Sequence, residues 1–393
     1  MAKNKMRKEK NQTLDLSKSQ YDFTKIPFDK LTRVGIRSML YRDMFTVSWL
    51  LGRFCNYHCS YCWAHGRSDT KDHRSTELCL TTINKIKEQA RERGFNSFHF
   101  SFSGGEPTLH PGYLDILKYL SDDITNTNYT SIHMTSNCSP GKAWFNKYAR
   151  IAQHLHRASI TCSYHREYVA DIKKRIKLAD KLELCQEWDI QVTINCVMVP
   201  EWFWQIMDEV MYFHERGINV TLKPQSDPHA NFVVAGYTDA MLEQLHNGMP
   251  QRAYTETKRQ IQRPIPTFLK TSDPIKDATG VPQHFQIEFI DEEGNPWYMD
   301  QAERFNAFNF NKFKGWECSS GYRSIIIREP DGSIKRSYSC SDKPLGYIFE
   351  DFKLFDKPML CISDSCVSSA DSKIPKRKVG TKLPLWPRDN TFK

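Results

Sequence analysis

Two patterns of apolar and polar positions alternate regularly between residues 45 and 223. Short apolar runs predict buried strands, whereas the segments between them repeat apolar residues every three or four positions and predict helices. Regular alternation of strands and helices is typical of a parallel sheet with right-handed crossovers. The six predicted strands are residues 45–54, 95–102, 129–135, 158–163, 190–199 and 218–223, and the five predicted helices are residues 80–93, 111–120, 142–152, 167–187 and 202–216.

Three cysteines follow the first predicted strand within the stretch Cys55-Asn56-Tyr57-His58-Cys59-Ser60-Tyr61-Cys62. A loop this short brings the three thiols onto one small inorganic centre. A four-iron cluster ordinarily takes four cysteine ligands, so three would leave one iron open to an external ligand with an amine and a carboxylate. The alternative is a structural zinc site that adds His58 or His65 to the three cysteines.

A second motif, Ser103-Gly104-Gly105-Glu106-Pro107, ends the next predicted strand. The two motifs, in this order and spacing, resemble the radical S-adenosylmethionine superfamily. The resemblance implies an α/β fold with a partial (βα)6 TIM-like barrel over residues 42–225. It further implies a [4Fe-4S] cluster on Cys55, Cys59 and Cys62, binding of the S-adenosyl-L-methionine amino group by Gly104, Gly105, Glu106 and Pro107, and a position near the adenine for Tyr61.

Enzymes of this superfamily reductively cleave S-adenosylmethionine to a 5′-deoxyadenosyl radical, which removes a hydrogen atom from the substrate. The cofactor supplies the difficult step, and the protein supplies orientation and exclusion of water. Trp63, His65 and Arg67 follow the cysteines closely and either face the substrate or pack. No side chain is assigned from the sequence as a catalytic acid, base or radical donor.

Polar residues also stand at the ends of the later predicted strands, where parallel sheets gather their chemistry. In the superfamily such positions contact the ribose and carboxylate of S-adenosylmethionine. Each one has a structural alternative as a helix cap, a buried hydrogen-bonding group or part of a solvated helix face. The candidates are Thr135, Ser136, Asn137, Ser163, His165, Asn195 and, on a helix, Arg175, with Lys223 and Gln225 as weaker ones.

Cys318, Cys340, Cys361 and Cys366 are the only cysteines after residue 200, and residues 322–334 between the first two predict a β-hairpin with Asp331-Gly332 at its turn. This arrangement resembles the auxiliary-cluster domain of the SPASM/Twitch subgroup. It implies a second [4Fe-4S] cluster of the smaller, Twitch-like form, with zinc on four thiolates as the alternative. We interpret the scattered cysteines as buried small hydrophobic residues: Cys79, Cys138, Cys162, Cys185 and Cys196.

Composition and charge narrow the class of protein. A chain of 393 residues with 39% hydrophobic content and no long apolar run is expected to be globular, without a membrane span. The basic N-terminus lacks a following apolar stretch, so we expect no secretory signal and a cytoplasmic location, where cysteines serve as metal ligands. The net charge of +9 is concentrated at the ends, because residues 1–10 hold five basic side chains and one acid and residues 373–393 hold seven and one.

The sequence predicts five regions. A basic lead-in precedes the core, a connector that forms part of the substrate wall follows it, and an auxiliary iron–sulfur domain precedes a basic tail. The connector is predicted to hold a helix at residues 239–246 and a hairpin formed by residues 285–289 and 297–298. The predicted regions are residues 1–41, 42–225, 226–310, 311–370 and 371–393, in that order.

The whole-chain pattern, from Cys55 to Lys376-Arg377-Lys378, also resembles radical enzymes carried by bacteriophages. Some of these isomerise N-glycyl-thymidine to C-glycyl-thymidine in viral DNA. The resemblance implies DNA as a partner, held by the basic ends, and flavodoxin or ferredoxin as electron donor. The alternative interpretation is that the two basic ends are solvated and disordered and bind no DNA. The alternative functions are a SPASM/Twitch-type peptide maturase or sulfatase-activating enzyme, and a non-catalytic iron–sulfur or zinc protein that binds nucleic acid.

Overall fold

The structure is a computed structural model that describes residues 22–37, 43–62, 67–227, 233–246, 265–271, 281, 284–340 and 342–381. Trp63, His65 and the basic residues of the two chain ends beyond these ranges lie outside the described residues. No helix in the described ranges is both long enough and apolar enough to cross a membrane.

Six parallel strands form the centre of a ten-stranded sheet, in the order in which they occur along the chain. The two edge strands of this sheet do not pair with each other, so the barrel is not closed. The predicted fold class, with a partial barrel, is confirmed. The central strands are β2 (Met44–Leu50), β3 (Ser97–Ser103), β4 (Tyr129–Ser136), β5 (Arg157–Tyr164), β6 (Gln191–Met198) and β7 (Asn219–Pro224).

Four further strands extend this sheet. β8 (Thr267–Leu269) pairs antiparallel with β7 on one side, and β12 (Ser324–Ile327) pairs parallel with β2 on the other. The predicted C-terminal hairpin is confirmed, because β12 pairs with β13 (Ser333–Lys335), which in turn pairs with β14 (Gly346–Tyr347). The parallel pairing of β12 with β2 was not predicted, and it joins the C-terminal part of the chain to the edge of the barrel.

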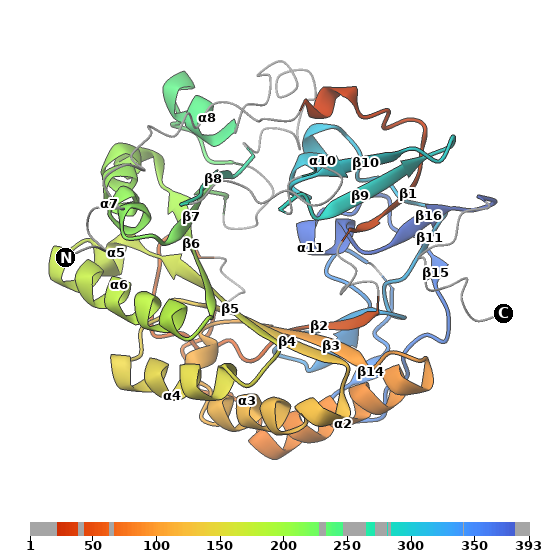
Figure 1. Ribbon diagram of the computed structural model, residues 1–393, viewed down its shortest axis with the longest axis horizontal. Helices are drawn as coiled ribbons and strands as arrows, with labels where there is room; N and C mark the ends of the chain where they lie inside the picture. Colours follow the sequence, from red (N-terminus) through yellow and green to blue (C-terminus); the bar gives the residue numbers. More distant parts are fainter. Residues whose placement is uncertain are drawn as a thin grey trace.

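Helices cover the outer face of the barrel sheet, as Figure 1 shows. The strands alternate accordingly: Phe98, Phe100 and Phe102 of β3 are fully buried toward the helices, whereas His99 and Ser101 face the concave side and are half-buried. The main helices are α2 (Thr76–Glu92), α3 (Tyr113–Asp122), α4 (Lys142–Ala152), α6 (Ile172–Glu187) and α7 (Phe203–Glu215), with 3-10 turns η3 (Pro107–Leu109), η4 (Ile124–Asn126) and η5 (Pro200–Trp202).

The prediction of one continuous helix over residues 167–187 is wrong, because the structure has two helices there. The structure has a short helix, α5 (Arg166–Val169), followed by a break and then α6. Asp171 causes the break, because its side chain caps α6 by accepting hydrogen bonds from the backbone amides of Lys173 and Lys174. The separation leaves α5 free to lie at the end of β5.

A second, six-stranded sheet draws together segments that are far apart in the sequence. The connector hairpin predicted around residues 285–298 supplies two of its strands. Within the described residues, the connector and the C-terminal half contain three short helices, α8 (Asp239–His246), α10 (Arg304–Ala307) and α11 (Ser369–Ser372). The strand order is β10 (Pro296–Met299), β9 (Ile287–Asp291), β1 (Leu31–Ile36), β16 (Lys376–Lys378), β11 (Trp316–Cys318) and β15 (Met359–Leu360).

The two ends of the described chain pair with each other in the middle of this sheet. The sequence analysis had placed them in a lead-in and a tail outside the folded domains. β1, preceded by the 3-10 turn η2 (Phe23–Lys25), pairs antiparallel with β9 and with β16. Leu31 and Val34 of β1 are completely buried. Burial on both faces gives β1 no apolar–polar alternation, which explains why the sequence pattern there is weak.

The basic run at Lys376–Lys378 is therefore part of a strand. Lys376 is 1% exposed, and its ammonium group donates hydrogen bonds to the backbone carbonyls of Asp371, Ser372 and Ile374 at 2.6, 3.2 and 2.9 Å. A buried ammonium with three acceptors has a structural role. The interpretation of this run as part of a solvated, DNA-binding tail is wrong for Lys376.

Candidate functional site

The loop Cys55–Cys62 leaves the carboxyl end of β2 and lies against the segment that follows β3. The backbone pairing of the two strands continues beyond their ends, because the amide of Gly105 donates to the carbonyl of Gly52 at 2.9 Å and the amide of Glu106 donates to the carbonyl of Phe54 at 2.8 Å. These hydrogen bonds fix the start of the cysteine loop relative to the Gly-Gly-Glu-Pro segment.

Glycine is required at both positions of the Gly-Gly pair. A Cβ atom on Gly104 would overlap the carbonyl oxygen of Gly52, and one on Gly105 would overlap the carbonyl oxygens of Arg53 and Phe54. Gly104 also has a φ of +134°, which L residues with a side chain rarely adopt. The two glycines allow the backbones after β2 and β3 to approach closely at the end of the barrel.

The three cysteines of the loop are free thiols, of which Cys55 and Cys59 are half-buried and Cys62 is exposed. Burial raises the pKa of the Cys55 thiol and raises that of Cys59 to about 12. Iron would have to displace these protons, since the thiolate is the metal ligand. In the described ranges, no three His, Cys, Asp or Glu side chains are arranged to hold a single metal ion.

Two features of these thiols fit an iron–sulfur cluster. One is their donor chemistry, and the other is the pair Gly104 and Gly105 beside them, which we call the glycine cradle. His58, one of the two histidines that the zinc alternative could use, is exposed, and its Nδ1 lies 2.6 Å from a guanidinium nitrogen of Arg67. Arg67 also forms an ion pair with Asp69. Arg67 was expected either to face the substrate or to pack. In the structure it packs against the cysteine loop.

The short helix α5 holds the cysteine loop from the opposite side. The Glu167 carboxylate accepts a hydrogen bond from the backbone amide of Ser60 at 3.0 Å and another from the Ser60 hydroxyl. The ring of Tyr168 stacks on that of Tyr57, with 3.9 Å between centroids and 4° between planes, and its hydroxyl accepts from the amide of His58. The sequence analysis did not identify Glu167 and Tyr168 as site residues, because it assigned them to the first turn of a long helix.

Tyr61 and His165 lie together between the loop and the end of β5. The Tyr61 hydroxyl and His165 Nδ1 are 3.0 Å apart, and the two rings are stacked. Burial lowers the pKa of His165 to about 4, so its neutral ring can accept the hydrogen bond. This contact gives the aromatic ring before Cys62 a fixed position.

Glu106 is 2% exposed and its carboxylate points into the protein. One oxygen accepts hydrogen bonds from the amide and hydroxyl of Thr108 and from the hydroxyl of Ser136, and the other accepts from the amide of Asn137 at 2.6 Å. Burial raises the pKa of this carboxyl group, and the four hydrogen bonds act in the opposite direction. Glu106 thus ties the end of β3 to the end of β4.

This geometry differs from the simplest form of the sequence prediction, in which Glu106 contacts an ammonium group directly. Its oxygens already have protein donors, so its clearest role is to orient Ser136 and Asn137. Asn137 in turn donates to the side-chain oxygen of Asn56 at 3.0 Å, beside Cys55. The predicted residues Ser136 and Asn137 are therefore brought to the cysteine loop. Pro107 begins the turn η3, with Glu106 as its cap.

The other predicted residues lie farther along the same edge. Ser163 of β5 and Asn195 of β6 are direct neighbours in the register of the sheet. The Nε atom of Arg175 is buried and has no hydrogen-bond partner among the described residues. Lys223 ends on the concave side of β7, half-buried, whereas Gln225 donates its backbone amide to the hydroxyl of Tyr237 at 2.7 Å.

The second set of cysteines is brought together from three separate segments. Cys318, at the end of β11, lines one pocket with Cys340, Cys361 and Cys366, as the sequence predicted for ligands of one centre. Backbone hydrogen bonds hold the last two, from the Cys361 amide to the Trp316 carbonyl at 2.8 Å and from the Cys366 amide to the Asn311 carbonyl at 2.7 Å.

Two buried cations accompany this pocket. Burial raises the pKa of the Cys361 thiol, while Lys376 and Arg336 act in the opposite direction. Arg336 is 4% exposed, and its Nε and Nη2 atoms have no hydrogen-bond partner among the described residues. Buried guanidinium groups need acceptors, so the donor set and Arg336 together fit a negatively charged metal–thiolate centre. An iron–sulfur cluster, whose thiolates bind different irons, meets that description, whereas no three of these side chains in the described residues are close enough together for a single zinc ion.

Comparisons with known proteins agree with the position of these motifs. Residues 49–214 match the Radical SAM superfamily, a span that runs from β2 into α7. No curated protein sequence matches the chain. Among solved structures, "Native anSMEcpe with bound AdoMet" is similar with 16% identity, 79% of each chain covered and a TM-score of 0.46. "Native anSMEcpe with bound AdoMet and Cp18Cys peptide" is similar with 15% identity, 79% and 78% coverage and a TM-score of 0.44.

Proposed function

We propose that this chain, which carries a radical SAM superfamily domain at residues 49–214, is an enzyme that rearranges a modified nucleobase in DNA. The family match supports the general radical SAM reaction. A reduced [4Fe-4S] cluster with bound S-adenosylmethionine supplies a 5′-deoxyadenosyl radical that removes a substrate hydrogen. The observation that carries this assignment is the three-cysteine loop fixed against the Gly-Gly-Glu-Pro segment at the ends of β2 and β3.

The residues of this chain have separate tasks in that reaction. Cys55, Cys59 and Cys62 hold the cluster, and the Gly-Gly pair lets the backbone come close to the group bound there. Glu106 sets the positions of Ser136 and Asn137 at the next strand end. Ser163 and Asn195 remain proposed contacts of the ribose and carboxylate, since they are neighbours in the register of the sheet near its carboxyl end. Arg175 remains a proposed contact because its Nε atom is buried and has no partner among the described residues.

The favoured substrate is N-glycyl-thymidine in viral DNA, and the favoured product is C-glycyl-thymidine. Removal of the glycyl α-hydrogen leaves a radical stabilised between an amine and a carboxylate. A bond then forms between that α-carbon and the thymidine methyl carbon while the bond from this methyl carbon to nitrogen breaks. The nitrogen-centred radical that results takes up one electron from the reductant and one proton, and 5′-deoxyadenosine is released with the abstracted hydrogen. The sequence resemblance to bacteriophage enzymes supports this choice, and the reaction changes neither mass nor oxidation state.

Binding of DNA is part of the same proposal. The net charge of +9 favours a polyanion. With Lys376 buried, the basic side chains at residues 1–10 and 382–393 are the main proposed contacts. Each phosphate contact releases counterions, so affinity should fall steeply as the salt concentration rises. Electron delivery by a flavodoxin or ferredoxin and a cytoplasmic location complete the proposal.

We further propose a second [4Fe-4S] cluster on Cys318, Cys340, Cys361 and Cys366, in a Twitch-like domain. The common pocket of these cysteines and the unpartnered donors of Arg336 support an anionic centre there. Zinc on four thiolates is the competing assignment. Metal analysis after anaerobic preparation separates the two, since the cluster requires about four additional irons per chain and zinc requires none.

The test of the whole proposal uses the full chain, reconstituted with iron and sulfide under anaerobic conditions and reduced. Three substrates are compared: DNA that carries N-glycyl-thymidine, unmodified DNA of the same sequence, and a cysteine-containing peptide. We expect 5′-deoxyadenosine formation to be stimulated by the glycyl-modified DNA alone, with a nucleoside product of unchanged mass and altered retention. Stimulation by the peptide instead would favour a peptide-modifying enzyme and would overturn the proposed substrate.

A further inference from the structure

The first two turns of α6 are strongly basic. Four of the first six residues of this helix are lysine or arginine, and its first turn contains no acidic residue. Lys173, Lys174 and Lys177 are exposed, and their ammonium groups form no ion pair or hydrogen bond with any described residue. Arg175, the fourth, is half-buried and is already a proposed contact of S-adenosylmethionine. The start of α6 therefore presents three unpaired positive charges to the solvent.

This concentration of positive charge is unfavourable for the helix itself. The N-terminus of a helix carries a partial positive charge, so it favours acidic side chains and disfavours basic ones. The Asp171 carboxylate, which caps the amides of Lys173 and Lys174, follows this rule. The lysine side chains do not follow it. A place where the sequence breaks a local rule without a gain in stability is where a function is expected.

Large apolar side chains are exposed beside these lysines. Ile172 and Ile176 are 46% and 40% exposed, and their spacing of four residues places them on one face of α6. Trp202, which is 36% exposed, belongs to η5 at the end of β6. The guanidinium carbon of Arg166 in α5 lies 5.8 Å from the centroid of the Trp202 ring. An aromatic ring and a cationic surface thus occur together at this end of the barrel.

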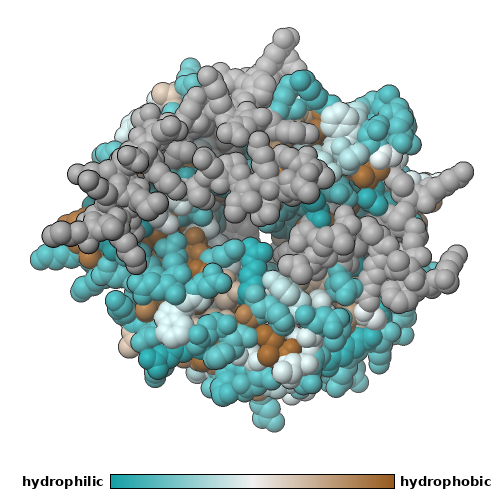
Figure 2. Space-filling model, viewed as in Figure 1, coloured by the Kyte–Doolittle hydropathy of each residue, from teal (hydrophilic) through white to brown (hydrophobic). Residues whose placement is uncertain are grey.

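We call this combination of side chains the α6 surface. At the left of Figure 2, where Figure 1 places α6, hydrophobic and hydrophilic residues lie side by side. The α6 surface consists of Arg166, Ile172, Lys173, Lys174, Ile176, Lys177 and Trp202.

The α6 surface adjoins the cysteine loop through α5. Glu167 of α5 accepts the hydrogen bond from the amide of Ser60 in that loop, and Arg166, the preceding residue, contacts Trp202. Two residues separate the end of α5 from the start of α6. Both helices follow the carboxyl end of β5, at the edge of the sheet where parallel barrels hold their active sites. A ligand on the α6 surface would therefore lie next to the candidate reaction site.

We propose that the α6 surface binds unpaired DNA next to the nucleotide that reacts. The inference rests on the proposed function and places DNA contacts on the folded core, in addition to those proposed for the basic ends. Lys173, Lys174 and Lys177 contact backbone phosphates, and Trp202 stacks on a base. Cationic side chains combined with an exposed aromatic ring are the means by which proteins bind single strands. A base that reacts inside a barrel has to leave its stack, which makes its neighbours available to such a ring.

The α6 surface fits a nucleic acid better than a lipid membrane. A helix that lies in a membrane interface turns a continuous apolar face toward the lipid. The apolar face of α6 is instead buried in the protein, through Leu178, Ala179, Leu182 and Cys185. Exposed apolar side chains are confined to the start of the helix, where unpaired lysines surround them.

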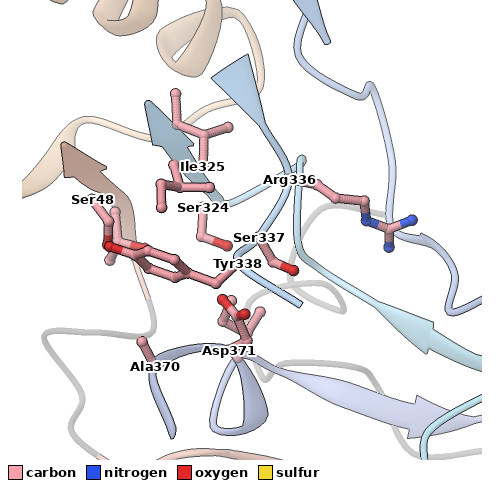
Figure 3. A pocket seen from close by; sticks show the side chains of 11 residues that line it. Ser48, Ser324, Ile325, Arg336, Ser337, Tyr338, Ala370 and Asp371 are labelled. Carbon is pink, nitrogen blue, oxygen red and sulfur yellow. The ribbon is translucent and has the colours of Figure 1, made fainter. Parts of the chain in front are cut away.

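The polar cavity between β2, β12 and α11 is not an alternative site for a base. Figure 3 shows the Tyr338 ring extending across this cavity toward Ser48 of β2. The cavity has a volume of about 40 Å³. A water molecule needs about 10–15 Å³ by the same measure, so the cavity has room for a few waters and not for a nucleobase.

The first test measures how the full-length, reconstituted protein binds a fluorescent single-stranded oligothymidine of about twelve nucleotides, a length within known site sizes. Lys173, Lys174 and Lys177 are replaced together by glutamine. We expect affinity to fall by about tenfold at low salt, because three phosphate contacts are lost. The slope of log affinity against log salt concentration should become shallower by about two, since each contact on a single strand contributes about 0.7.

The control is a second triple variant with the same change in net charge. Lys312, Lys353 and Lys357 are exposed lysines of the C-terminal part of the chain, and they too are replaced by glutamine. We expect their removal to leave the salt slope unchanged, because they lie outside the α6 surface. Equal effects of the two triple variants would show that net charge alone acts, and this would overturn the proposal.

The second test compares two exposed tryptophans. Trp202→Ala should weaken oligothymidine binding by about tenfold, because stacking of a base on an aromatic ring is lost, and Trp202→Phe should restore part of the affinity. Trp204→Ala is the matched control. Trp204 is 48% exposed, but Asp208 stands one turn further along α7 on the same face, where a phosphate is disfavoured. Undiminished binding by Trp202→Ala, or an equal loss in Trp204→Ala, would contradict the assignment.

Vesicles of an anionic phospholipid distinguish a membrane from DNA as the ligand of the α6 surface. We expect the α6 lysine variant and the wild type to behave alike toward vesicles and differently toward oligothymidine. Loss of vesicle binding with unchanged oligothymidine binding would assign the surface to a membrane and would overturn the proposal. Melting temperatures equal to that of the wild type show that the variants are folded.

The two proposals fail in different ways, because binding is measured with unmodified DNA. If glycyl-modified DNA is not a substrate while the α6 lysine variant loses affinity for oligothymidine, the proposed function fails and the DNA surface stands. If the α6 lysine variant and Trp202→Ala both turn over glycyl-modified DNA with the KM of the wild type, the function stands and the surface does not.

Discussion

The two sets of cysteines are assembled in opposite ways. The first comes from a single loop of eight residues, partly exposed, at the open end of the barrel. The second comes from three segments spread over residues 318–366, and three of its four cysteines are buried. Three ligands beside a glycine cradle leave room for a small molecule, whereas four ligands in a buried pocket complete a centre by themselves. The difference predicts chemistry at the first set and a supporting role for the second.

The largest effect is expected when the first set of cysteines is removed and the second set is retained. Replacing Cys55, Cys59 and Cys62 with alanine should abolish 5′-deoxyadenosine formation, because the cluster that binds S-adenosylmethionine would be lost. Iron should fall from about eight to about four atoms per chain. Chromatography of the reaction and iron analysis measure the two effects. Formation of 5′-deoxyadenosine by the triple variant would show that the site is misplaced.

The close approach of the Gly104–Gly105 backbone to the start of the cysteine loop can be tested without changing a cysteine. Gly105→Ala places a methyl group against the carbonyl oxygens of Arg53 and Phe54, which cannot move without disturbing the loop. Overpacking of this kind costs about 1–3 kcal/mol, so cluster content and S-adenosylmethionine affinity should both fall. Gly141→Ala is the matched control, since no atom lies within 4 Å of its added methyl group. Equal effects of the two substitutions would remove the argument from the glycine cradle.

The role of Glu106 gives a smaller and more specific effect. Glu106→Gln replaces an acceptor by an amide donor that faces the hydroxyl of Ser136 or the amide of Asn137. Loss of hydrogen bonds to a charged group costs about 1–3 kcal/mol, and S-adenosylmethionine should bind more weakly by a corresponding factor. Ser136→Ala removes one donor only and should weaken binding less. Calorimetric titration of S-adenosylmethionine distinguishes the two, and a larger effect for Ser136→Ala would contradict the orienting role of Glu106.

The smallest expected effect concerns the contact between α5 and the cysteine loop. Tyr168→Phe keeps the stacking on Tyr57 but removes the hydrogen bond to the amide of His58. A single hydrogen bond of this kind is worth about 0.5–1.5 kcal/mol, so the cluster should be lost modestly faster on exposure to a chelator. Tyr119→Phe, which removes a hydroxyl contact to Asn84 far from the loop, is the control and should leave the rate unchanged.

Much of the barrel could be predicted from the sequence, because each strand and helix carries its own periodicity. The boundaries of α4 and α8 agree with the predictions, and the strands β2 to β7 lie where apolar runs were found. The break between α5 and α6 was missed because its cause is local: Asp171 caps a new helix within a pattern that otherwise continues. As a result, two residues that hold the cysteine loop were not recognised as part of the site.

The second sheet could not be predicted, because its order depends on contacts between distant segments. β1 pairs with β9 and β16, more than 250 and 340 residues away in the sequence. No local pattern distinguishes such strands from an irregular lead-in or tail. Charge counting failed at Lys376 for the same reason, since a basic run gives no sign of whether its side chains meet water or backbone carbonyls.

The most direct test of the contrast between the two cysteine sets is electron paramagnetic resonance of the reduced protein with and without S-adenosylmethionine. The account predicts that S-adenosylmethionine changes the spectrum of the wild type, because it binds the iron that the three-cysteine loop leaves open. It predicts no change in the variant that lacks Cys55, Cys59 and Cys62 and retains the second set. A wild-type spectrum that ignores S-adenosylmethionine, or a response that persists in the variant, would contradict it.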